Sequence, residues 1–232
     1  MEATASPDRA VEERFDAVEA AIAAGTPIGR SGFWPLVATI KADPALVEAY
    51  ADRAGRIDAA AFRANVRPIV PVAVGNLAML GVLLGGVVAL VLAAATDGWF
   101  SGLCLLAAAG TWALGVHAPT HWLVGRAMGM RFIGYFVGGP PPPRPGLKTD
   151  YATYLRVPAR RRAWFHASGA IATKIAPFLV LAIAPLVDAP GWAVLAVAVV
   201  AIFQIVTDVV FSTKTSDWKK FSREMAFARD AG

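Results

Sequence analysis

The sequence predicts an all-α, polytopic membrane protein of about four transmembrane helices, with a small helical N-terminal domain in the cytoplasm. Two observations of composition predict this fold class. Hydrophobic residues make up 56% of the 232 residues and charged residues only 17%. The mean hydropathy is +0.53, which exceeds what a soluble chain of this length can bury in a core.

The third observation is where the apolar residues lie. They gather in residues 69–213, whereas residues 1–68 are polar and mixed. We therefore predict a helical cytoplasmic domain over residues 1–68, a four-helix transmembrane domain over residues 69–213, and a cytoplasmic tail over residues 214–232.

Helix-start signals divide the first 68 residues into short helices. A cap residue followed by proline predicts a helix over residues 7–25. The same signal at Asp43 predicts a second helix that ends at Gly55, and Asp58 is a candidate cap for a third helix that reaches Arg67. We find no catalytic group of side chains in this domain, so we expect it to dock or regulate.

Four apolar runs are long enough to cross a hydrocarbon core of about 30 Å. They cover residues 69–95, 99–124, 164–187 and 192–211. The chain opens on an acidic helical stretch instead of a short basic and apolar leader, so we expect no cleaved signal peptide. The first membrane helix is then the targeting signal.

Basic residues indicate which ends of these helices face the cytoplasm. Lys and Arg lie before the first run, between the second and third, and after the fourth, whereas the loops around Asp97 and Asp188 have none. We therefore expect a multi-pass protein, of a bacterial inner membrane, with both termini cytoplasmic. The net charge of +5 follows from these topology signals, so we expect the lipid bilayer as a partner and no nucleic acid.

The connection between the second and third runs contains two unusual segments. Residues 130–137 are apolar and aromatic, which favours either a membrane-dipping strand or hairpin, or plain anchoring at the membrane interface. Residues 138–143 read GGPPPP, which excludes helix and favours an extended, polyproline-like segment. We expect a proline-rich cytoplasmic loop or lid near residues 138–150.

His117 and His121 lie four residues apart in the second run, so both imidazoles project from the same face of a helix. This is the spacing with which two helical side chains bind one metal ion. Two of the chain's three histidines are involved. The alternative is a pair of interfacial histidines that hydrogen-bond to neighbouring helices.

A zinc ion would need a third protein ligand and an open position for water. Asp217, just after the fourth run, and Asp208, at its end, are the candidates. Asp217 could instead cap a tail helix. Asp208 would be costly inside a membrane without a partner, so we expect it to pair with Lys174 or with a metal.

The segments around the histidines resemble the site-2 protease family of intramembrane zinc metalloproteases. HAPTH at residues 117–121 stands where that family has HExxH. Residues 126–139 resemble its Gly-x-Arg and its strand that ends in Gly-Gly. Residues 167–173 resemble its AGPxxN element, with Thr173 in place of the asparagine.

This resemblance covers roughly residues 102–221 and implies a zinc ion held by His117, His121 and Asp217. Asp217 sits where the family's third ligand, in an Asp-Gly pair, would fall. The resemblance also implies that the substrate or partner is another transmembrane helix.

Three positions depart from the family pattern. Ala118 replaces the glutamate that serves the family as general base, Pro119 removes a backbone donor inside the motif, and Trp218 replaces the glycine after the aspartate. Losing a positioned base costs about 10² to 10⁴ in rate, so proteolysis would need a substitute. His166 is a weak candidate for that role.

Three functions remain open on this sequence. The favoured one is a site-2-protease-like protein with a zinc site, either an atypical protease or a catalytically degenerate relative. The second is a non-enzymatic scaffold that binds a partner helix, which Ala118 favours. The third is a transporter or haem-binding protein, in which the two histidines hold haem or pass ions and Lys174 with Asp208 forms a proton-coupled pair.

Overall fold

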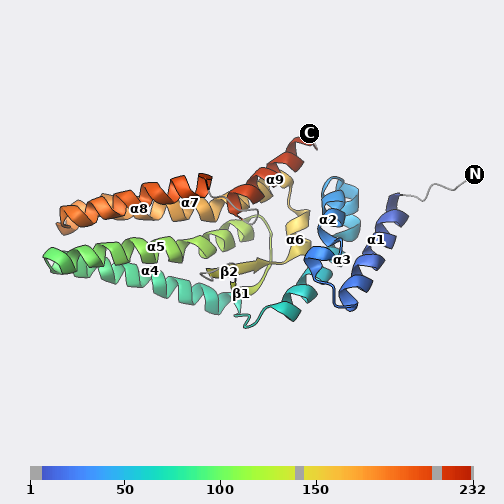
Figure 1. Cartoon of the computed structure of the whole chain (residues 1–232), viewed down its shortest axis with the longest axis horizontal. Coiled ribbons are helices and arrows are strands. Elements are labelled where there is room, and N and C mark those ends of the chain that lie inside the picture. Colours follow the sequence, from blue (N-terminus) through green and yellow to red (C-terminus); the bar gives the residue numbers. More distant parts are fainter. Residues whose placement is uncertain (1–6, 139–143, 211–215, 231–232) are drawn as a thin grey trace, which may run out of the picture.

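The computed structural model describes residues 7–138, 144–210 and 216–230. Within them the chain is predominantly helical, and one two-stranded antiparallel sheet is present. Figure 1 shows an elongated molecule in which long helices form one end, shorter helices form the other, and the sheet lies between them. The first and last described residues both lie at the short-helix end.

The N-terminal part consists of three helices, α1 (Pro7–Ala23), α2 (Phe33–Lys41) and α3 (Pro44–Asn65), with a short 3₁₀ turn at Ile28–Arg30. Asp43 caps α3 as predicted, because its carboxylate accepts a hydrogen bond of 2.8 Å from the Ala45 amide. Phe15, Phe33, Leu36 and Ile40 are fully buried in this region.

The predicted stop at Gly55 is wrong, because α3 continues through it to Asn65. Gly55 instead allows a close approach to α6 (Tyr151–Arg156). A Cβ at Gly55 would lie 2.7 Å from the Ala152 Cβ. Asp58 caps no helix either, since it lies inside α3, where it is buried and pairs with Lys148 at 2.6 Å.

The prediction of four membrane-length helices is confirmed. Among the described residues, four helices are long and apolar enough to cross a membrane. They are α4 (Val72–Ala95), α5 (Gly98–Ala127), α7 (Ala159–Ile183), which continues into a 3₁₀ turn at Ala184–Val187, and α8 (Gly191–Val210). The third helix thus begins before its predicted start at Trp164.

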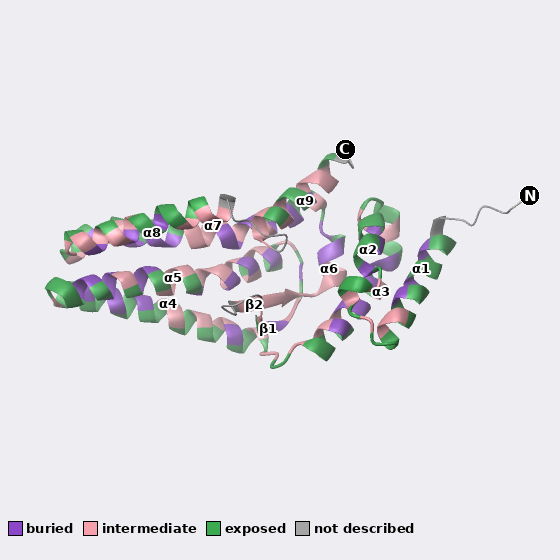
Figure 2. Ribbon diagram, viewed as in Figure 1, coloured by how far each residue is buried: buried purple, intermediate pink, exposed green. Residues whose placement is uncertain are grey.

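The outer faces of these helices are apolar and exposed, whereas the inner faces pack on small residues. Leu77 and Val88 of α4 and Phe203 of α8 are all more than half exposed, and Figure 2 shows exposed residues along the outer sides of both helices. Between the helices, Gly86 of α4 lies against Trp112 of α5. Small residues at helix contacts and apolar outer faces are typical of helices packed in lipid.

The predominantly helical structure is consistent with the predicted all-α fold class, and the segment after α5 adds one short hairpin to it. Strand β1 (Phe132–Gly138) pairs antiparallel with β2 (Arg144–Thr149), with Tyr135 opposite Leu147. A strand in residues 130–137 is thus confirmed, while its dipping into the membrane stays a prediction. Residues 144–149, predicted as loop, form β2. The proline-rich residues 139–143 lie outside the described residues.

The last helix, α9 (Asp217–Asp230), begins where the sequence predicted a tail helix. The Ser216 hydroxyl accepts a hydrogen bond of 3.3 Å from the Lys219 amide, which caps the helix. Helix α9 packs against α7, at the end of the bundle that faces the N-terminal helices. This packing brings the start of α9 to the histidines of α5.

Candidate metal centre

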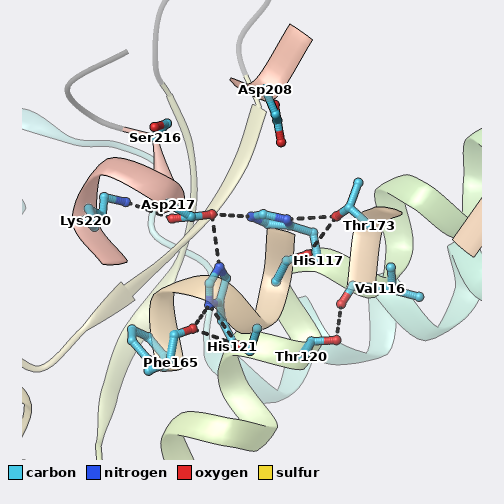
Figure 3. A network of polar contacts seen from close by, with 12 residues as sticks. Val116, His117, Thr120, His121, Phe165, Thr173, Asp208, Ser216, Asp217 and Lys220 are labelled. Carbon is cyan, nitrogen blue, oxygen red and sulfur yellow. Dashed lines mark hydrogen bonds and ion pairs between the residues drawn. The ribbon is translucent and has the colours of Figure 1, made fainter. Parts of the chain in front are cut away.

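His117, His121 and Asp217 meet at one point between α5 and α9, although about a hundred residues separate them in sequence. Asp217 Oδ2 lies 3.3 Å from His117 Nε2 and 3.3 Å from His121 Nε2. The two imidazole rings are 4.9 Å apart and nearly perpendicular. Figure 3 shows both rings turned towards the Asp217 carboxylate.

The hydrogen bond on the far side of His121 determines its tautomer. His121 Nδ1 lies 2.9 Å from the Phe165 carbonyl oxygen of α7. A carbonyl can only accept, so Nδ1 carries the proton and donates it. Nε2 of the neutral imidazole is then an unprotonated lone pair, and this is the atom that faces Asp217.

The same reasoning applies to His117. Its Nδ1 lies 3.0 Å from Thr173 Oγ1, and that hydroxyl donates its one proton to the Gly169 carbonyl at 2.9 Å. Thr173 therefore accepts from His117 Nδ1–H, and His117 Nε2 also presents a lone pair to Asp217. Both histidines are held as metal-binding histidines usually are, with the other ring nitrogen donating to a fixed acceptor.

With both imidazoles neutral, three electron-pair donors converge here without a proton of their own between them. The repulsion among two Nε2 lone pairs and a carboxylate oxygen requires a cation or an additional proton at their centre. Ligand atoms 2.0 to 2.1 Å from a tetrahedral zinc ion lie roughly 3.3 Å apart. The two measured N to O distances match this spacing and are longer than the usual 2.7 to 3.2 Å of an N–H···O hydrogen bond.

The second carboxylate oxygen of Asp217 is engaged separately, because Lys220 Nζ lies 3.1 Å from Oδ1. Burial by itself raises the pKa of the Asp217 carboxyl, but a proton shared with His117 and His121, together with the charge of Lys220, holds that pKa well below its usual range. Asp217 is therefore an ionised carboxylate with Oδ2 directed at the histidines.

Glycine at position 169 makes room for this arrangement. A Cβ at Gly169 would lie 2.3 Å from His121 Nε2, so any side chain would occupy the space of the ligand atom. On α5, the helix continues through Pro119 and the Thr120 hydroxyl donates to the Val116 carbonyl at 2.7 Å. Ala118 is 3% exposed and offers no proton acceptor.

The other predicted residues lie outside the three-residue group. Asp208 of α8 forms an ion pair with Lys174 of α7, which is one of the two partners predicted for it. His166 is engaged by the Tyr154 hydroxyl, 2.8 Å from its Nε2. The structure therefore joins Asp217, and not Asp208, to the histidines.

Sequence reasoning missed the residues that orient the ligands. The Phe165 carbonyl is a backbone group and has no signature in the sequence. Lys220 does have a signature in the sequence, because a lysine three residues after an aspartate on a helix lies beside that aspartate. Thr173 was singled out only through the family resemblance.

Comparisons with known proteins found no family model, no curated protein and no solved structure that matches this chain. Any assignment of function therefore depends on the residues and geometry of the chain itself.

Proposed function

We propose that this chain is an integral membrane protein that binds one zinc ion through His117 Nε2, His121 Nε2 and Asp217 Oδ2. The observation that supports this most is that each imidazole has an oxygen acceptor at its Nδ1 and directs its Nε2 at the same carboxylate oxygen. Two imidazoles and a carboxylate suit zinc in a site with three protein ligands.

The membrane placement follows from the four apolar helices and from the basic residues at one end of them. With Lys and Arg kept in the cytoplasm, the N-terminal helices, the hairpin and α9 all lie on the cytoplasmic side, and so do both termini. The metal centre then lies at the cytoplasmic end of α5, where the His117 side chain is 38% exposed.

We assign the protein to the site-2-protease type, as a catalytically degenerate relative. A zinc ion with three protein ligands keeps an open position, where it lowers the pKa of bound water and polarises a carbonyl. The chain supplies Thr173 and Phe165 to orient the histidines, but Ala118 cannot take a proton from water. The exposed side of His117 would admit a segment of another membrane helix, which the protein holds and does not cleave efficiently.

Elemental analysis of the detergent-purified chain tests the metal centre. We expect about one zinc per chain, and none in His117→Ala, His121→Ala or Asp217→Asn. Asp208→Asn is the matched control, because it removes the other candidate carboxylate, and it should keep its zinc. No zinc in the unmodified chain, or loss in Asp208→Asn alone, would contradict the proposed site.

A further inference from the structure

Asp217 differs from the two histidine ligands in how its position is fixed. The histidines lie inside the long helix α5, in its C-terminal half, whereas Asp217 is the first residue of α9, a separate helix of 14 residues. The position of its carboxylate therefore depends on how α9 docks on the rest of the molecule.

Glu224 is the buried charged residue of α9. It follows Asp217 by seven residues, which places it about two turns along and on the same helix face. Glu224 is only 4% exposed. A carboxylate so deeply buried is retained in its ionised form only if cations or hydrogen-bond donors surround it.

Three different elements surround the Glu224 carboxylate. Arg162 Nε of α7 donates to Oε2 at 2.7 Å, the Tyr154 hydroxyl of α6 donates to Oε1 at 2.9 Å, and Lys41 Nζ of α2 donates to Oε1 at 2.5 Å. Burial alone would raise the pKa of the Glu224 carboxyl, but Lys41 and Arg162 lower it below its usual range. The N-terminal domain, through Lys41, thus adds a second cation to the ion pair between Glu224 of α9 and Arg162 of α7.

Lys41 is the last residue of α2, and only 9% of its side chain is exposed. Its ammonium lies 5.1 Å from the centre of the Tyr154 ring and 5.5 Å from that of Phe227 on α9. Removing this charge would leave Glu224 with one cation in place of two and would loosen the contact between α9 and the N-terminal helices.

We infer that Glu224 is a positioning residue for the third metal ligand, and that the N-terminal domain, through Lys41, sets the affinity of the metal centre. This inference rests on the proposed zinc site. Whatever moves α2 relative to the bundle then changes the distance between Asp217 and the two histidines, which gives the N-terminal domain control over metal binding.

The test is a zinc titration of the full chain in detergent, in competition with a chromogenic chelator. We expect Lys41→Met to weaken zinc binding about 10- to 100-fold, the range typical when a partner that orients a metal ligand is lost. Lys41→Arg keeps the charge and should stay within a few-fold of the unmodified chain.

Arg156→Met is the matched control. It removes another ion pair between the N-terminal domain and the rest of the chain, the 2.8 Å contact of Arg156 with Asp52, but this pair does not involve α9. It should leave zinc affinity unchanged. An equal loss in Arg156→Met and Lys41→Met would mean general destabilisation and would overturn the inference.

Glu224→Gln provides a second variant if Lys41→Met does not fold, since the amide keeps the shape of the side chain and removes its charge. Hydrogen exchange adds a direct readout of docking, in which α9 amides should exchange faster in both variants while those of α4 do not change. Zinc binding by the unmodified chain with no change in either variant overturns this inference alone. No zinc in the unmodified chain overturns the metal centre as well.

Discussion

A methyl group at Gly169 would lie 2.3 Å from His121 Nε2, the atom that faces Asp217. We therefore expect Gly169→Ala to displace the imidazole and to weaken zinc binding about 10- to 100-fold, as does loss of a group that orients a metal ligand. Gly110→Ala on α5 is the control, because nothing lies within 4 Å of a Cβ there. Equal zinc contents of the two purified variants would contradict this account.

The proposed site-2-protease type gives a second prediction at the level of single residues, because Ala118 stands where that type has its general base. Ala118→Glu restores a proton acceptor next to His117, and a positioned base contributes about 10² to 10⁴ in rate. We expect this variant to cleave a transmembrane-helix substrate in detergent faster than the unmodified chain by a factor in that range. Ala118→Gln places a side chain of the same size as glutamate at this buried position, but the amide cannot take a proton. This variant should therefore cleave no faster than the unmodified chain.

Between helix α3 and strand β2, the buried carboxylate of Asp58 pairs with Lys148 at 2.6 Å. Lys148→Met would leave Asp58 buried without its cation, which typically costs 3 to 5 kcal/mol, so we expect a loss of about 3 kcal/mol in the free energy of unfolding. Asp58→Asn combined with Lys148→Met removes both charges and should recover most of the lost free energy of unfolding. Denaturant unfolding of the single and double variants measures the difference.

Helix α9 provides a prediction on pH. Because Lys41 and Arg162 hold the pKa of Glu224 below the ordinary 4.5, the ionised carboxylate stabilises the fold above pH 4.5, and this stability is lost as the pH falls below that value. Glu224→Gln lacks this contribution. We therefore expect the thermal stability of Glu224→Gln to lie below that of the unmodified chain at pH 7. The two stabilities should approach each other below pH 4.5. A difference that stays constant with pH would contradict the role given to the Glu224 carboxylate.

The sequence predicts those elements whose signals are local, and fails where distant contacts decide. The apolar runs predict the four long helices because length and composition alone satisfy the requirement for crossing a membrane. Gly55 was read as a helix stop, but its role is contact with Ala152 of α6, almost a hundred residues away. The proximity of Asp217 to the histidines follows from the docking of α9, which no local pattern encodes.

At the scale of the whole molecule, one buried cluster joins the N-terminal helices to the bundle. Phe15, Phe33 and Ile40 of the N-terminal helices belong to the same cluster as Leu155 of α6 and Phe165 of α7. The Phe165 carbonyl holds His121, so this packing reaches the proposed metal site directly. A domain boundary at residue 68 remains a sequence prediction, and the packing gives the two parts a common core.

The orientation of the chain in the membrane gives the last prediction. Cys104 is the only cysteine and is buried, so Cys104→Ala provides a background for single-cysteine labelling. Glu12 on α1 and Asp97 just before α5 are both exposed. Helix α1 lies at the short-helix end of the molecule, and the turn between α4 and α5 lies at the opposite end (Figure 1). The distribution of Lys and Arg places Glu12 in the cytoplasm and Asp97 on the other side.

In intact cells that express the chain, a membrane-impermeant maleimide should therefore label Asp97→Cys at once and Glu12→Cys only after the cells are permeabilised. The proposed metal site, towards the end of α5 that faces the N-terminal helices, would then draw its zinc from the cytoplasm. Labelling of Glu12→Cys from outside would invert the topology, and the exposed face of His117 would have to receive its partner helix from the opposite compartment.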